Sequence, residues 1–133
     1  MWLHDIMKNE KIITRENNTV LYLENDIIKA EILPDDGGRL VSLVDKSSGR
    51  EYIWTNPRTK NLLRTYGANY DNLSAGGIEE AFPTGYPDNH NGDELPFFGE
   101  IWSVGWEYSP SENSRNGWHL HTQCSIYPIT PIA

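Results

Sequence analysis

The sequence predicts an all-β protein, an antiparallel β-sandwich, and two observations support this prediction. Apolar residues recur with a period of two: Ile28, Ala30 and Ile32 alternate with the charged Lys29 and Glu31. Aromatic residues make up 11% of the chain, with five Trp and seven Tyr, and such residues favour strands over a helical bundle. The length of 133 residues fits a single domain that includes the whole chain.

The residue pattern in the first half of the chain predicts a meander of short strands separated by turn-forming residues. The glycine pair Gly37–Gly38 suits a tight turn after the second strand, because glycine adopts a positive φ easily. Residues up to Glu16 fit either a short helix or a strand, so residues 1–18 are interpreted as an N-terminal extension or a first strand. The four expected strands are Thr19–Leu23, Ile27–Leu33, Arg39–Val44 and Glu51–Trp54.

The second half of the chain is less periodic. Residues 55–72 and 84–94 are rich in Gly, Pro, Asn and Asp, and are expected to form long loops, which are often functional in compact domains. Strand-like order returns at Ile101–Val104 and at Gly117–Ile126.

Composition excludes several function classes. The net charge of −8 argues against a nucleic-acid backbone or an anionic membrane as partner. Cys124 is the single cysteine, so neither a disulfide framework nor a cysteine metal cluster is possible, and no cofactor or metal is predicted. Neither a signal-peptide pattern nor an apolar run of transmembrane length is visible, so a cytoplasmic protein is the expectation.

Two phrases of the sequence suit a sugar ligand. Gly76–Thr84 and Leu95–Trp102 each combine a glycine, a carboxylate and aromatic residues. Sugar hydroxyls hydrogen-bond carboxylates, whereas the C–H faces of a sugar pack on aromatic rings. The two phrases therefore predict a carbohydrate or a sugar derivative as the partner.

These phrases and the first strands resemble the galactose mutarotase-like superfamily, which includes the aldose 1-epimerases. The resemblance covers roughly Thr19 to Tyr108. Gly-Gly-Ile-Glu-Glu-Ala-Phe-Pro-Thr is similar to a glycine-pair, acid and Phe-Pro segment of that family, and Leu95–Trp102 to a segment usually written Leu-Pro-Asp-His-Gly-Glu-Leu-Trp. The early segments with the same order are Leu23–Asn25, Ile32–Pro34, Gly37–Arg39 and Gly49–Glu51.

The resemblance implies a large β-sandwich with a sugar in an open cleft on one sheet. Family members open and reclose the sugar ring with an acid and a base, a glutamate and a histidine. Phe98 stands where many members have an early histidine, and a phenylalanine cannot transfer a proton. The catalytic groups of the family lie mostly in the second half of its fold, past the end of this chain.

The chain is therefore expected to be the N-terminal part of such a domain. Its acid and base would be supplied by a C-terminal half, and its uncovered strands would permit self-association. The Phe98 ring is expected to face the concave sheet surface beside Glu79, Glu100 or Trp102. The candidate sugar-binding residues are Arg39, Glu79, Glu80, His90, Phe98, Glu100 and Trp102.

Each candidate also has a structural interpretation. Glu79, Glu80, His90 and Glu100 could be solvated surface groups, and Trp102 could be a core residue. A strand-edge Arg39 paired with Asp35 or Asp36 needs no ligand. Three functions therefore stay open: an aldose 1-epimerase-like isomerase, a non-catalytic carbohydrate-binding module, and a β-domain with a structural or regulatory role.

Overall fold

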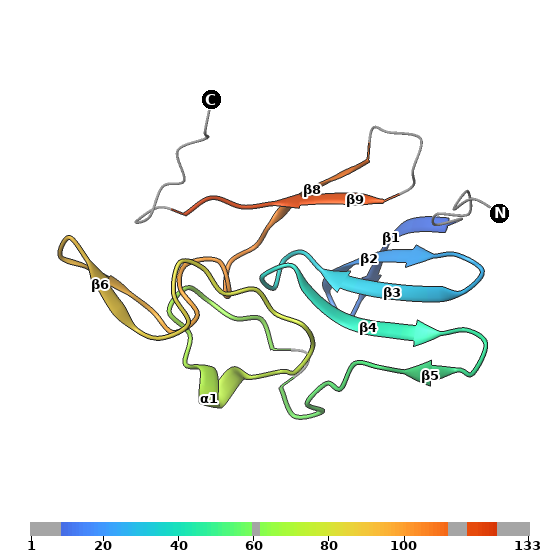
Figure 1. Cartoon of the computed structure of the whole chain (residues 1–133), viewed down its shortest axis with the longest axis horizontal. Coiled ribbons are helices and arrows are strands. Elements are labelled where there is room, and N and C mark those ends of the chain that lie inside the picture. The colour runs from blue at the N-terminus through green and yellow to red at the C-terminus, as the bar shows by residue number, and fades with distance from the viewer. Residues whose placement is uncertain (1–8, 60–61, 112–116, 125–133) are drawn as a thin grey trace.

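The largest element of the computed structural model, which describes residues 9–59, 62–111 and 117–124, is a five-stranded antiparallel sheet (Figure 1). Its strands lie in sequence order: β1 (Asn9–Arg15), β2 (Asn18–Glu24), β3 (Ile28–Leu33), β4 (Arg39–Asp45) and β5 (Arg50–Glu51). Helix within these residues is limited to the four-residue α1 (Tyr70–Leu73). The prediction of an all-β protein is confirmed.

Two further hairpins lie outside this sheet. The first pairs β6 (Asp88–His90) with β7 (Asp93–Leu95), and the second pairs β8 (Glu107–Pro110) with β9 (Trp118–His121). Figure 1 shows the β8–β9 hairpin beside the β1 end of the sheet, where the Gly117 N–H donates to the Glu10 carboxylate at 2.9 Å. The β6–β7 hairpin projects from the other end of the molecule.

Local turn chemistry explains the meander. Glu16 and Asn17 both have positive φ angles, 50° and 68°, as a two-residue hairpin between twisted strands requires. The Asn25 side chain accepts hydrogen bonds from the Ile27 and Ile28 backbone N–H groups and closes the next turn. The predicted strands at 19–23, 27–33 and 39–44 agree with β2, β3 and β4 to within about one residue.

The two faces of the sheet differ in chemistry. On one face Leu21 lies opposite Ile32, and Leu21 is fully buried. On the other face Tyr22 lies opposite Glu31, and its hydroxyl donates to Glu24 at 2.7 Å. Burial, followed by this hydrogen bond, raises the pKa of Tyr22 to about 12. Lys46 in turn bonds Glu24 at 2.6 Å, so the polar face is held by side-chain pairs.

The predicted strand at Ile101–Val104 is wrong, because these residues form turns. The Val104 carbonyl accepts from the Gly37 N–H at 2.9 Å, and the Trp106 N–H donates to the Pro34 carbonyl at 2.8 Å. The segment therefore hydrogen-bonds to the β3–β4 turn instead of to a neighbouring strand. Its apolar residues Ile101, Trp102 and Val104 serve local packing, which their composition does not distinguish from a strand.

Smaller differences occur elsewhere. The predicted strand at Glu51–Trp54 is reduced to β5, and the one at Gly117–Ile126 to β9, with residues 125–126 outside the described residues. Residues 84–94, expected to be a loop, contain most of the β6–β7 hairpin. Residues 9–15 form β1, so the alternative of a helix before Glu16 is wrong for that part, while residues 1–8 lie outside the described residues.

No helix formed by the described residues is long and apolar enough to cross a membrane.

Candidate functional site

The two phrases that predict a sugar ligand, Gly76–Thr84 and Leu95–Trp102, lie side by side in the fold. Phe82 and Gly99 form a parallel β-bridge. The Glu100 N–H donates to the Phe82 carbonyl at 2.8 Å, and the Phe82 N–H donates to the Phe98 carbonyl at 3.3 Å. We call this pairing the Phe82–Gly99 clamp. Residues 83–98, with the β6–β7 hairpin, leave and re-enter the domain at this clamp.

Gly99 is required for the clamp. Its φ is +70°, a conformation that residues with a side chain rarely adopt. A Cβ atom at this position would lie 2.7 Å from the Pro83 nitrogen, and closer still to the Phe82 carbonyl. The two chains approach so closely because one of them has no side chain at the contact.

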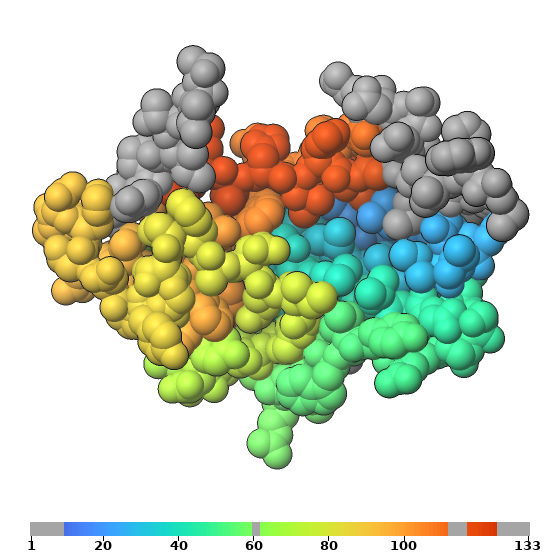
Figure 2. Space-filling model, in the orientation of Figure 1, coloured from blue at the N-terminus to red at the C-terminus, as the bar shows by residue number. Residues whose placement is uncertain are grey.

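A pocket of about 390 Å³ opens between the clamp and the hairpin, and we call it the hairpin pocket. Its apolar wall consists of Phe82, Pro83 and Leu95, of which Leu95 is 5% exposed. Figure 2 shows the hairpin in yellow on one flank of the molecule, apart from the blue and cyan sheet. The polar residues that line the pocket are Thr84, Asp88, Asn89 and His90.

The polar groups of the hairpin pocket are partly committed to local hydrogen bonds. One carboxylate oxygen of Asp88 accepts from the Asn89 N–H at 2.8 Å, and the Asn89 side-chain oxygen accepts from the Gly92 N–H at 2.9 Å. Within the described part of the chain, Asp88 Oδ2 and Asn89 Nδ2 have no hydrogen-bond partner. These two atoms are one acceptor and one donor group that make no hydrogen bond within the described part of the chain.

His90 ends β6 and is half-buried at the edge of the hairpin pocket. Its Nε2 atom lies 3.1 Å from the side-chain nitrogen of Asn91. Of the seven residues predicted from the sequence, His90 alone lines this pocket.

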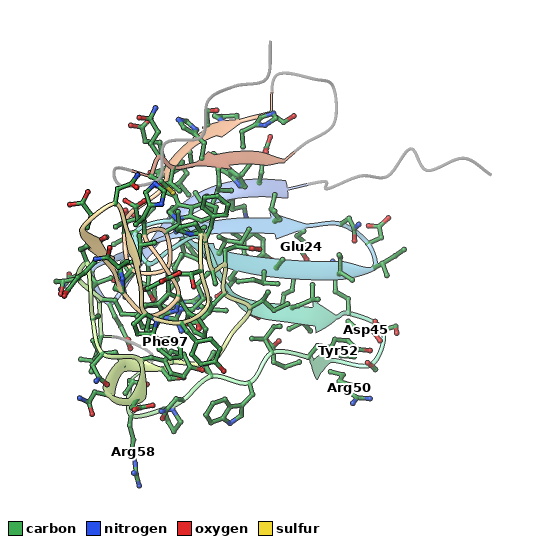
Figure 3. All side chains as sticks on the ribbon, turned by 60° about the vertical axis from the view of Figure 1, so that its left-hand side comes forward. Glu24, Asp45, Arg50, Tyr52, Arg58 and Phe97 are labelled. Atoms are coloured by element: carbon green, nitrogen blue, oxygen red, sulfur yellow. The ribbon has the colours of Figure 1, made fainter. Side chains whose placement is uncertain are left out.

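An aromatic cluster stands behind the clamp, made of Tyr70, Phe97, Phe98 and Trp102. The Phe98 ring packs edge-on against Tyr70 and Phe97, with centroids 4.7 Å away in both cases, and against Trp102 at 5.7 Å. Tyr86, which is 75% exposed, contacts Phe97 at 5.5 Å. Figure 3 shows Phe97 among the crowded side chains beside α1. Phe98 thus lies beside Trp102 in a half-buried cluster.

A buried ion network lies next to the aromatic cluster. Asp36 accepts from Arg39 at 2.9 Å (Nε) and 2.5 Å (Nη2), and from Arg64 Nε at 2.6 Å. Arg64 also donates to Glu79 at 2.7 Å, and its guanidinium lies 4.1 Å from the Trp102 ring centroid. The side chains of Asp36, Arg39 and Arg64 are 1% exposed, and that of Glu79 is 14% exposed.

The network determines what several predicted residues can do. Arg39 pairs with Asp36, the partner that its structural interpretation required. Trp102 is 1% exposed and Glu100 is 3% exposed, so a ligand on the surface does not reach these side chains. Glu79 lies at the edge of the network, while Glu80 is exposed and outside it. The fold brings Arg39, Glu79, Phe98 and Trp102 together, with His90 separate from them.

Glu100 also affects a cysteine. Burial, then the negative charge of Glu100 and a hydrogen bond with it, raise the pKa of the Cys124 thiol. Burial, then the negative charge of Glu100, also raises the pKa of Tyr66. Cys124 is therefore held as a neutral thiol, which is the less reactive form.

Sequence reasoning missed Arg64, Asp88 and Asn89. A usable signal existed for the hairpin: Asn91-Gly92 is the preferred dipeptide of a two-residue β-turn, and both residues have positive φ angles, 54° and 98°. For Arg64 the sequence holds no comparable signal, because its partners Asp36 and Glu79 are far away along the chain.

Comparison with known proteins identifies one family for this chain. Among the described residues, no three His, Cys, Asp or Glu side chains come together as a metal site. No curated protein shows significant similarity to the chain. The family model of a domain of unknown function, DUF5107, matches residues 6–92, a range that includes the five-stranded sheet, the ion network and much of the hairpin pocket. Because this match covers more than half of the chain, the protein belongs to the DUF5107 family.

Proposed function

We propose that this protein binds a carbohydrate in the hairpin pocket. The observation that carries the proposal is the composition of the pocket walls: a ring and two aliphatic side chains face a carboxylate, an amide, an imidazole and a hydroxyl. A sugar presents the matching surfaces, because its C–H face packs on a ring and its hydroxyls both donate and accept hydrogen bonds. The volume of about 390 Å³ lies within the usual range of small-ligand sites.

The two uncommitted polar atoms support the same ligand. Asp88 Oδ2 can accept one sugar hydroxyl, while Asn89 Nδ2 can donate to a neighbouring hydroxyl oxygen. Phe82 supplies the ring of the apolar wall, and the exposed Tyr86 ring lies close by in the chain. A few such contacts, each contributing about 1 kcal/mol net, give a dissociation constant on the order of millimolar.

The resemblance of the sequence to galactose mutarotase-like proteins agrees with this proposal and extends it. Acid–base exchange at the anomeric carbon needs two groups that move protons. Asp88 and His90 line one pocket, and a carboxylate with an imidazole is such a pair. We therefore propose aldose 1-epimerase-like chemistry as the second candidate function, with non-catalytic sugar binding as the first.

A titration of isotope-labelled protein with glucose and galactose, followed by NMR, tests the first function. Saturable shifts are expected at the Asn89 side-chain amide and at the Leu95 backbone amide. Asp88→Asn removes one strong acceptor and is expected to weaken binding about fivefold. Asp93→Asn is the matched control, since it changes the same chemical group in the same hairpin outside the pocket lining.

Shifts that are absent, or that the Asp88 variant leaves unchanged, would contradict the proposal. The second function has a separate readout, the NMR exchange rate between the two anomers of glucose. Acceleration by the wild-type chain that Asp88→Asn abolishes would support isomerase chemistry. Binding without acceleration would leave the protein as a carbohydrate-binding module.

A further inference from the structure

A second cavity lies on the polar face of the five-stranded sheet, and we call it the sheet pocket. Its volume is about 320 Å³, and it is lined by residues of the β1–β2 turn, by residues of strands β1 to β5, and by Thr55 after β5. It shares no lining residue with the hairpin pocket. The two cavities are therefore independent sites.

The floor of the sheet pocket is aliphatic. It is formed by Val20, which is 2% exposed, Leu33, which is 7% exposed, and Val41. No aromatic ring is present among its lining residues, so a sugar face has no stacking surface here. The floor suits a short alkyl chain.

Asn18 is the polar group built into this floor. The residue is 8% exposed and lines the pocket, yet its side-chain amide makes no hydrogen bond to any described residue. Its polar atoms are accessible from the pocket, so the amide is open to a partner that enters there.

The charges around the sheet pocket identify the sign of that partner. Arg15 is neutralised by Glu31, to which it donates two hydrogen bonds. Glu51 accepts from Ser42 and from the Leu43 and Ile53 N–H groups, which satisfies the carboxylate but leaves its negative charge.

Glu16 adds a second negative charge on the exposed rim, without an ion pair among the described residues. The lining thus carries one positive and three negative groups, a net charge of −2. The net charge of −8 on the whole chain adds to the attraction for a cation.

We propose that the sheet pocket binds a primary alkylammonium ion. The alkyl chain packs on Val20 and Leu33, and the ammonium donates to the Asn18 side-chain oxygen and the Thr55 hydroxyl, within the field of Glu16 and Glu51. An ammonium group has three donors and no acceptor, which suits a rim of oxygen atoms. This proposal does not depend on carbohydrate binding at the hairpin pocket.

The test is an NMR titration of the labelled full chain with butylammonium chloride, at constant ionic strength. The neutral isostere 1-butanol is the ligand control. Saturable shifts of the Asn18 side-chain NH₂ signals are expected with butylammonium, and a dissociation constant at least tenfold higher with 1-butanol. Added salt is expected to weaken the binding of butylammonium.

Substitutions test the charge of the pocket and its hydrogen-bonding groups separately. Glu16→Gln is expected to raise the dissociation constant roughly threefold, as an exposed charge pair allows, whereas the distant Glu107→Gln leaves it unchanged. Asn18→Ala is expected to raise it at least fivefold. Thr55→Val keeps the side-chain shape and removes one acceptor, so it repeats the test if Asn18→Ala does not fold.

Equal affinity for butylammonium and 1-butanol would overturn the proposal, because the charge would then play no part. An absence of saturable shifts up to high millimolar concentration would overturn it as well. Wild-type affinity for butylammonium in folded Asn18→Ala and folded Thr55→Val would also overturn it. Glucose-induced shifts at Asn18 would assign a polyol to this pocket instead of a cation.

Discussion

Replacing Arg64 by methionine is expected to lower the free energy of unfolding by about 3–5 kcal/mol, the usual cost of removing one partner from a buried ion pair. Methionine keeps a similar length and an apolar stem, so the change removes mainly charge and hydrogen bonds. The lost contacts are the bonds to Asp36 and Glu79, and the guanidinium stacking on Trp102. Asp36 would keep Arg39 as its remaining partner.

The magnitude is large relative to the stability of a domain this size. Domains have about 5–15 kcal/mol in total, so the substitution removes a third or more of a typical value. The melting temperature is expected to fall by roughly 10–25 °C, at about 3–5 °C per kcal/mol for a chain of this length. Arg64→Lys should recover part of the loss, since lysine restores the charge but not the planar fork of donors.

The assay is urea unfolding followed by circular dichroism and by tryptophan fluorescence. Arg58→Met is the matched control, because Arg58 is exposed and Figure 3 shows it pointing away from the domain. Its effect is expected to stay within about 0.5 kcal/mol. A loss below about 1 kcal/mol for Arg64→Met, in a folded variant, would refute the view that this network stabilises the fold.

Two further predictions concern the clamp and the response to acid. Gly99→Ala is expected to lower the free energy of unfolding by more than about 2 kcal/mol, because the position has a positive φ and an added Cβ clashes with Phe82. Gly85→Ala is the control in the same denaturation assay and is expected to stay near neutral, because the space around its Cβ is open. The hydrogen bond from Lys46, followed by that from Tyr22, lowers the pKa of Glu24 below its ordinary value of about 4.5. Its contribution to stability is therefore complete above pH 4.5 and is lost as the pH falls through the folded pKa. Between pH 6 and pH 3 the melting temperature of Lys46→Met should fall less steeply than that of the wild-type chain. An equally steep fall would contradict the assignment of the lowered Glu24 pKa to Lys46.

The strands were predictable where alternation and turn chemistry agreed. Between Asn18 and Asp45, apolar residues alternate and the intervening turns contain Asn or Gly, so local signals fix β2, β3 and β4. At Ile101–Val104 the residues are mostly apolar, as in a strand, but the backbone bonds to the β3–β4 turn. That contact is non-local, and a pattern of residues in one segment does not contain it.

The candidate site was predictable in its composition more than in its arrangement. The two phrases around Phe82 and Gly99 were recognised as related, and the fold pairs them directly. Which of their side chains face solvent was not predictable, because Glu100 and Trp102 are buried by segments far away in sequence. His90 was selected for its type, whereas Asp88 and Asn89 became visible as pocket residues only through the hairpin.

The Phe82–Gly99 clamp separates the proposed binding residues from the five-stranded sheet. Because residues 83–98 begin and end at one backbone pairing, their length and sequence can change without altering the register of the five-stranded sheet. An exchange of residues 83–98 between two members of the family would transfer Asp88, Asn89 and His90 together. The register of the sheet would not depend on the exchanged residues, whereas Phe97 and Phe98 would have to be kept, because they pack against Tyr70 and Trp102.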